Sequence, residues 1–152
     1  MNRLELRKLS LEFRRLSSNL LNSTDDTADI NLSRFLKFIN GNELISGIIQ
    51  DKISGVDYDF KECYDIGSAD WADYTPPVDE ACHIKAQYDY LNFINNENTV
   101  NVRSQAMNYC WSDKKINTII QNFLDMAFKP LIDYINDQLS MEMIVYDEEE
   151  KA

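Results

Sequence analysis

Hydrophobic residues along most of the chain recur at intervals of three and four, the spacing that places side chains on one face of an α-helix. The first such stripe predicts a helix whose buried face carries Leu6, Leu9, Phe13, Leu16 and Leu20. The polar run NSTDDTAD follows it. Its Ser, Thr and Asp oxygens can accept hydrogen bonds from the free N–H groups that begin a helix, so a second helix is expected there.

Two shorter helices are predicted next, over about residues 30–39 and 44–53. The sequence Asn-Gly-Asn at 40–42 separates them. We expect Gly41 to adopt the left-handed conformation that often follows a helix, and Asn42 to cap the next one. Gly55 is expected to end that third helix.

The stretch DYDFKECYDIGSADWADY (residues 57–74) combines acidic and aromatic residues with a single lysine. A short helix is expected over 59–66, whereas 68–77 lack periodicity and contain two consecutive prolines that exclude a helix. We expect an ordered loop with two alternative roles. Its aromatic residues either plug the open end of the helical bundle or form a recognition surface for a partner, with these candidate residues: Asp70, Trp71, Asp73 and Tyr74.

The pattern in the second half of the chain predicts three helices. One helix should begin at Asp79 or Glu80 and continue to about residue 95, and a shorter helix containing residues 102–110 should be capped by Thr99. The last apolar stripe runs from Ile116 to Leu139 over more than six turns, with Ser112 or Asp113 as its cap. Pro130 lies inside it, which predicts a kink at about 127–129.

These elements define an all-α, single-domain bundle of about six to seven helices with a long kinked C-terminal helix. We expect this domain to span residues 1–146, with 147–152 as an acidic flexible tail. The low content of four Gly and three Pro argues against a turn-rich β-sandwich or barrel. No apolar run approaches the roughly 18 residues that a membrane span needs, so none is expected.

The formal net charge of −11 is unevenly distributed. Residues 1–22 carry five basic and two acidic side chains, whereas residues 23–80 carry four basic and thirteen acidic ones. Such a body should repel nucleic acid, so direct nucleic-acid binding is not expected. Either the basic first helix faces an anionic surface or its charges are simply solvated. The asymmetry favours a basic protein partner and also permits a homo-oligomer, basic end to acidic body.

Catalytic and metal-binding motifs are not evident, and we expect neither an enzyme nor a cofactor. A calcium loop starting at Asp57 would place Lys61 at a ligand position and Glu62 where the turn needs glycine. Glycine-rich nucleotide motifs are absent from the sequence. The residue five positions before the single His83 is Val78, so the Arg-x-x-x-x-His pattern of some helical ribonucleases is absent too.

The three cysteines, Cys63, Cys82 and Cys110, show no spacing typical of a disulfide framework or a zinc site. We interpret them as reduced, structural thiols in a cytoplasmic protein. The alternative is a helical enzyme with an unrecognised site. Such an enzyme would need a pocket that brings a cysteine together with His83, with clearly shifted pKa values.

The segment SDKKINTIIQNFLDMAFKPLIDYINDQLSMEMI, with Asn122-Phe123 and Pro130-Leu131, and the earlier SRFLKFINGNELISGIIQ resemble an all-helical N-terminal module. That module occurs in uncharacterised bacterial proteins associated with phage defence or mobile elements. The resemblance carries no catalytic residues. It implies a non-enzymatic protein-interaction or regulatory module in phage defence. A further hypothesis is a phage or mobile-element inhibitor whose acidic surface mimics nucleic acid.

Overall fold

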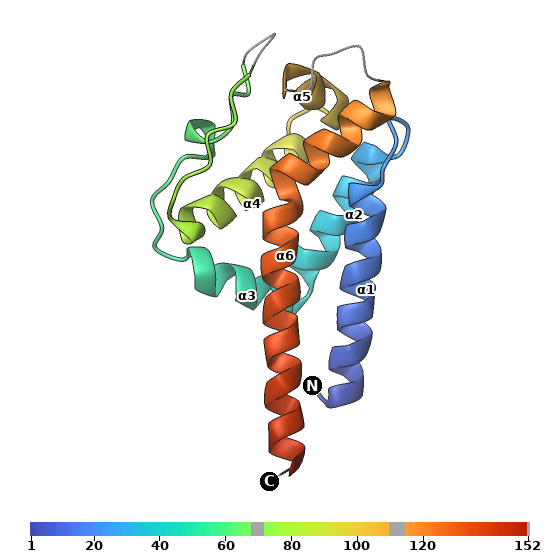
Figure 1. The fold of residues 1–152 in the computed structure, drawn as a ribbon, viewed down its shortest axis with the longest axis vertical. Helices are drawn as coiled ribbons and strands as arrows, with labels where there is room; N and C mark the ends of the chain where they lie inside the picture. Colours follow the sequence, from blue (N-terminus) through green and yellow to red (C-terminus); the bar gives the residue numbers. More distant parts are fainter. Residues whose placement is uncertain (68–71, 110–114, 152) are drawn as a thin grey trace.

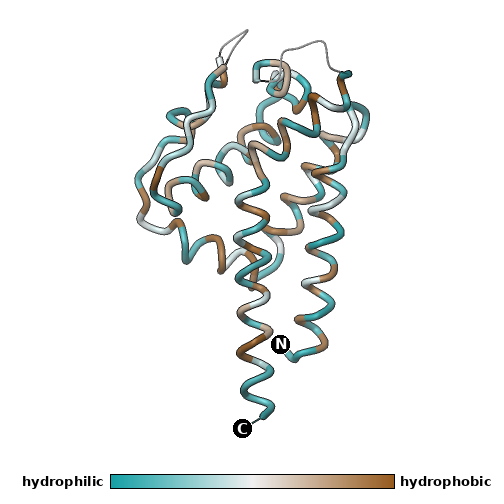
Figure 2. The backbone as a smooth tube through the Cα atoms, viewed as in Figure 1, coloured by the Kyte–Doolittle hydropathy of each residue, from teal (hydrophilic) through white to brown (hydrophobic). Residues whose placement is uncertain are grey.

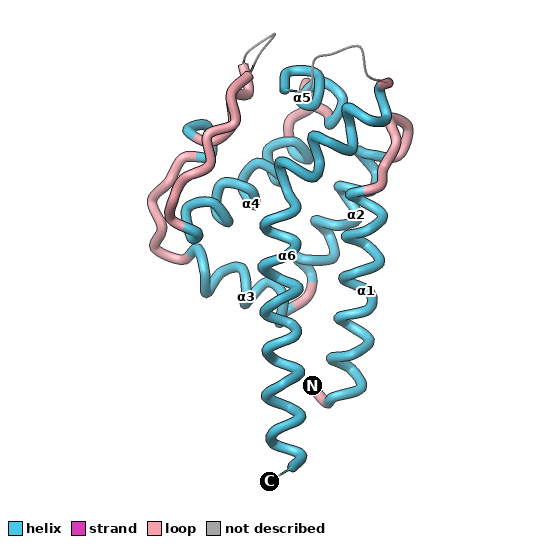
Figure 3. The backbone as a smooth tube through the Cα atoms, viewed as in Figure 1, coloured by secondary structure: helices cyan, strands magenta, loops and turns pink. Residues whose placement is uncertain are grey.

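The computed structural model describes residues 1–67, 72–109 and 115–151, which contain six α-helices and one short 3-10 helix (Figure 1). Within these residues the β pairing consists of one isolated bridge, and loops connect the helices (Figure 3). The predicted all-α domain with a long C-terminal helix is therefore confirmed. The elements are α1 (Arg3–Leu21), α2 (Ala28–Gly41), α3 (Glu43–Ile53), η1 (Phe60–Glu62), α4 (Glu80–Asn96), α5 (Val102–Tyr109) and α6 (Ile116–Lys151).

Helix α1 begins with a reciprocal cap. The Glu5 N–H donates to the Asn2 side-chain oxygen at 2.9 Å, and the Asn2 N–H donates to the Glu5 carboxylate at 3.3 Å. This arrangement satisfies two of the backbone donors that a helix start leaves free. The predicted apolar stripe is confirmed: Leu6, Leu9, Phe13 and Leu20 are buried, and Leu16 is half-buried.

Helices α2 and α3 form where the periodicity predicts them, although α2 starts two residues earlier. The Ile45 N–H donates to the Asn42 side-chain oxygen at 3.0 Å, so Asn42 caps α3 as expected. The prediction of a left-handed Gly41 is wrong, because Gly41 is the last residue of α2 and the chain leaves through an extended Asn42. Gly55, just after α3, does adopt a positive φ of 77°.

The predicted helix over 59–66 is wrong, because only η1 forms there. Cys63 and Tyr64 instead pair with the backbone of Thr75 and Tyr74, on the other side of the loop. The Thr75 N–H donates to the Cys63 carbonyl at 2.9 Å, and Tyr64 and Tyr74 form the isolated antiparallel bridge. These contacts use backbone groups that a longer helix would need for its own hydrogen bonds.

The start of α4 agrees with the prediction from the sequence, whereas the predicted cap of α5 does not. Helix α4 begins where predicted, and Asp79 caps it by accepting from the Ala81 N–H at 2.8 Å. The Thr99 cap for α5 is wrong, because the Asn101 side chain accepts from the Ser104 N–H at 2.7 Å and α5 begins after it. Asparagine is as effective at this position as threonine, so sequence alone does not decide between them.

Helix α6 runs through the domain, changes direction along its length and extends beyond the other helices (Figure 1). Pro130 lies inside it, as the predicted kink requires, whereas Ser112 and Asp113 lie outside the described residues. Residues 147–151, predicted to be a flexible tail, continue the helix. Arg3 of α1 contacts this end, with ion-pair distances of 2.9 Å to Asp147 and 3.3 Å to Glu150.

The core lies where α6 meets the other long helices. Its buried residues are mostly leucine and isoleucine, and hydrophobic positions recur along the helices (Figure 2). Pairs of aromatic rings pack within this core. Phe13 and Phe35 pack with ring centroids 5.8 Å apart, and Phe123 meets Phe128 edge to face at 6.1 Å. None of the described helices has the length and apolar content needed to cross a membrane.

Candidate functional site

The bend of α6 is the structural base of the candidate site. Proline has no N–H and its ring crowds the carbonyl of the preceding turn, so the helix cannot keep its regular hydrogen bonds at Pro130. Two backbone groups there bond to side chains. The Leu131 N–H donates to the Gln87 amide oxygen at 2.7 Å, and the Ala127 carbonyl accepts from the Tyr64 hydroxyl at 2.9 Å. In a regular helix these two groups would pair with each other.

Gln87 connects this bend to the surface. Its oxygen is used by Leu131, so its amide nitrogen points to the other side, 3.2 Å from Nε2 of His83. The Tyr74 hydroxyl lies 2.7 Å from the same ring nitrogen. A chain of hydrogen-bonding groups therefore runs from the buried backbone of α6 through α4 to the loop that carries Tyr74.

These hydrogen-bonding groups favour the neutral form of His83. An amide nitrogen only donates hydrogen bonds, so the contact with Gln87 is a hydrogen bond in the tautomer whose Nε2 carries no proton. Burial lowers the pKa of His83 below its ordinary value, and the Glu80 carboxylate partly offsets this effect. A protonated imidazole would place an N–H opposite the amide N–H of Gln87. The neutral ring is thus the form that the surrounding groups favour.

The cysteine available to this region is poorly suited to nucleophilic chemistry. Cys63 is buried, and burial raises the pKa of its thiol to about 11, so the reactive thiolate is scarce near neutral pH. Cys82 is a free, half-exposed thiol on α4, and Cys110 lies outside the described residues. The described residues also contain no group of three or more His, Cys, Asp and Glu side chains arranged for a metal ion.

The acidic segment, defined here as residues 56–79, is held against the domain by aromatic side chains. Phe60 stacks on Tyr90 with centroids 5.8 Å apart, and Tyr64 lies between Tyr74 at 5.4 Å and Tyr90 at 4.3 Å. The Tyr109 hydroxyl donates to the Asp65 carbonyl at 3.0 Å. The described parts of this segment, 56–67 and 72–79, are therefore held in place mainly by packing and hydrogen bonds.

Several acidic residues of the described part of this segment are exposed to solvent. Asp57, Glu62, Asp65 and Asp73 are exposed, and none of their carboxylates forms an ion pair or hydrogen bond with another described residue. Lys61 is the single basic residue within the segment. The described part of the segment thus presents uncompensated negative charge on an ordered backbone.

The four predicted partner-binding residues divide into three groups. Asp73 is exposed, as a recognition surface requires. Tyr74 is half-buried against Tyr64 and His83, which agrees with the plug alternative. Asp70 and Trp71 lie outside the described residues. The role of Gln87 was not predicted from the sequence, although Pro130 inside a predicted helix signals that some side chain must satisfy the freed backbone groups.

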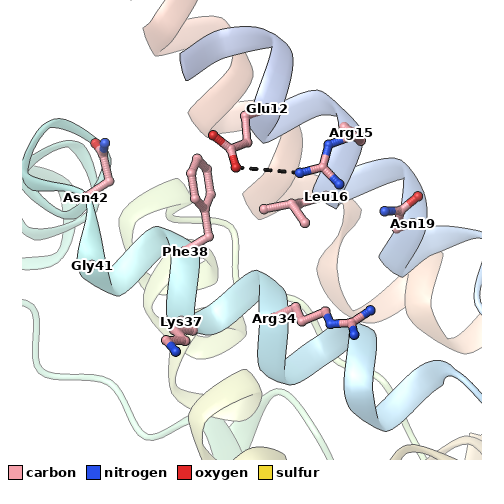
Figure 4. Close-up of a pocket in the computed structure, with 9 residues that line it drawn as sticks. All are labelled: Glu12, Arg15, Leu16, Asn19, Arg34, Lys37, Phe38, Gly41 and Asn42. Carbon is pink, nitrogen blue, oxygen red and sulfur yellow. Dashed lines mark ion pairs between the residues drawn. The ribbon is translucent and has the colours of Figure 1, made fainter. Parts of the chain in front are cut away.

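A second surface feature lies between α1 and α2. A pocket of about 590 Å³ opens there, with Leu16 and Phe38 between the helices and polar residues around them (Figure 4). Arg15 belongs to α1, and Arg34 and Lys37 belong to α2. Sequence reasoning noticed the basic residues of the first helix but not their pairing with α2, because that requires knowing which faces of the two helices meet.

Comparison of the chain with protein-family models, curated proteins and solved structures found no match.

Proposed function

We propose that this chain is a non-enzymatic protein-interaction or regulatory module whose acidic segment binds a basic surface on another protein. The observation that carries the proposal is the set of exposed, unpaired carboxylates on a loop held by buried tyrosines. Asp57, Glu62, Asp65 and Asp73 belong to this set. Charge of one sign on an ordered surface steers an oppositely charged partner and sets its orientation.

The anchoring of the segment matters for affinity. Binding has to overcome the entropy lost when a loop becomes ordered, and a loop that is already fixed loses less. Tyr64 is fully buried and bonded to α6, so the backbone around Asp65 is held before any partner arrives. The buried hydrogen bond from Tyr64 to α6 therefore serves to hold the acidic segment in place.

The polar groups that an enzyme would use are engaged elsewhere. Nε2 of His83 lies within hydrogen-bonding distance of the Gln87 amide and the Tyr74 hydroxyl, and Cys63 is buried as a neutral thiol. A nucleophile needs an oriented base and access to substrate. These features favour a binding role over the helical-enzyme hypothesis.

The experiment is affinity capture from the source cells on the immobilised full chain, followed by quantitative mass spectrometry. Asp65→Asn/Asp73→Asn is compared with Asp51→Asn/Asp125→Asn, which removes the same charge from exposed sites on α3 and α6. We expect a basic protein that is captured by wild type and by the α3/α6 variant, and lost from the acidic-segment variant. Its retention should weaken as salt screens the charges. Equal capture by both variants would contradict the proposal.

The proposed setting in phage defence rests on the resemblance of residues 33–50 and 112–144 to modules of that kind. A phage-challenge assay with the two variants above tests it, since only the acidic-segment variant should lose protection. Competition with duplex DNA tests the inhibitor hypothesis. If DNA displaces the chain from its captured partner, the acidic segment occupies a nucleic-acid site; if it does not, the segment binds elsewhere on that partner.

A further inference from the structure

The pocket between α1 and α2 is an amphipathic groove. Its apolar part is formed by Leu16 and Phe38, which also pack against the core. Arg15, Arg34 and Lys37 line it, against one acidic lining residue. Arg34 and Lys37 form no ion pair with another described residue. In a protein of net charge −11, this is a local concentration of positive charge beside an apolar surface.

The C-terminal end of α6 has the opposite character. Met141, Ile144 and Val145 are 56%, 53% and 48% exposed. Their spacing of three and four places them on neighbouring positions of one helix surface. Exposed Asp137 and Glu148 lie one turn before and after them. This end projects beyond the body of the domain, with a hydrophobic band followed by a hydrophilic terminus (Figures 1 and 2).

The helix end cannot reach the groove of its own chain. Arg3 holds it through Asp147 and Glu150, and Nε of Arg14 lies 3.4 Å from the Asn136 side-chain oxygen. These contacts lie on the side of α1 that faces α6, whereas the groove lies on the side that faces α2. Any α6 segment that occupies the groove therefore has to come from another molecule.

We propose that the groove between α1 and α2 binds the C-terminal segment of α6 from a second copy of this chain. An amphipathic helix that places its apolar face in a groove is a common recognition mode. Here the apolar faces match, and the carboxylates that flank Met141 and Val145 would lie against Arg34 and Lys37. Each copy has one helix end and one groove, so the exchange can be reciprocal, as in the twofold symmetric dimers that most homo-oligomers form.

This self-association is independent of the acidic segment and of any partner bound there. The test is light scattering coupled to size-exclusion chromatography on the full chain, from about 1 μM to about 1 mM, the range that separates specific from weak association. The variants are Lys37→Glu in the groove, Glu148→Lys on α6, and the two together. Lys61→Glu and Glu62→Lys serve as controls, because they make the same charge changes on η1, away from both surfaces.

We expect wild type and both controls to form a salt-sensitive dimer. Each single reversal should weaken the dimer about tenfold, since coupling between close charges across an interface commonly exceeds 1.4 kcal/mol. The double variant should recover most of this loss. A wild-type chain that stays monomeric over the whole range overturns the proposal. A dimer that neither single variant weakens overturns it as well, because its interface would then lie elsewhere.

Discussion

Replacing Gln87 by leucine should destabilise the domain far more than the loss of one amide suggests. Gln87 is fully buried and satisfies the Leu131 N–H that the Pro130 bend leaves without a regular helix partner. Leucine has a similar volume, so the packing of the core changes little. The substitution leaves the Leu131 N–H without its hydrogen-bond partner and removes one of the two contacts to Nε2 of His83, while the Tyr74 hydroxyl remains.

The size of the effect follows from these two groups. A buried N–H without a partner costs about 1–3 kcal/mol, and the lost contact with His83 adds about 1 kcal/mol. The expected decrease in the free energy of unfolding is therefore about 2–4 kcal/mol, a large part of the roughly 5–15 kcal/mol typical of a domain. Gln50→Leu on the exposed side of α3 is the matched control, with an expected change within about 0.5 kcal/mol.

Urea unfolding followed by circular dichroism measures these differences, provided that the slope m stays constant. Pro130→Ala tests whether the bend is the reason that the Leu131 N–H needs Gln87. A straightened α6 can pair Leu131 with Ala127, so the cost of Gln87→Leu should fall by about 1 kcal/mol or more in that background. A cost below about 0.5 kcal/mol, or the same cost with Pro130 and with alanine, would refute this account of the bend.

Two other predictions concern the same fold. Burial lowers the pKa of His83 in the folded state, so between that pKa and about pH 6.5 the native state binds fewer protons than the unfolded state. The contribution of His83 to the free energy of unfolding is therefore complete above about pH 6.5 and is lost as the pH falls toward the lowered pKa. Urea midpoints between about pH 7 and about pH 5 should therefore decrease more for wild type than for His83→Gln, and equal slopes would contradict the assignment. Asn42→Ala should cost about 1 kcal/mol by removing the cap of α3. The control Asn40→Ala, two residues earlier at the exposed end of α2, loses only a hydrogen bond from Tyr88 and should cost less.

The helices were predictable because their periodicity reflects one buried face per element. The stripe of α1 and the long stripe of α6 both appear in the structure with their predicted faces inward. Asn42 was predictable as a cap because its side chain directly precedes the third helix, and the start of α4 was predictable from the acidic residues at 79 and 80. Local chemistry decides these features, and the sequence contains it.

Among the predictions that were wrong are the helix over 59–66 and the flexible tail at 147–152. Both regions make contacts with other segments of the chain. Residues 59–66 have an acceptable helical pattern, yet Cys63 and Tyr64 pair with the backbone near Tyr74. Residues 147–151 continue the helix and form ion pairs with Arg3 at the other end of the chain. The candidate site is a mixed case, since its acidic character is visible in the sequence but its anchoring by Tyr64 and Gln87 is not.

The pairing of α1 with α6 also affects how the chain can fold during synthesis. Residues 22–115 separate the two helices. At about 5–20 residues per second, α1 leaves the ribosome roughly 5–20 s before the first turn of α6 exists. Helices α2 and α3 can form early, because their contacts are local, whereas closing the domain must wait for the last helix. The apolar face of α1 is consequently the surface that a chaperone would need to shield for the longest time.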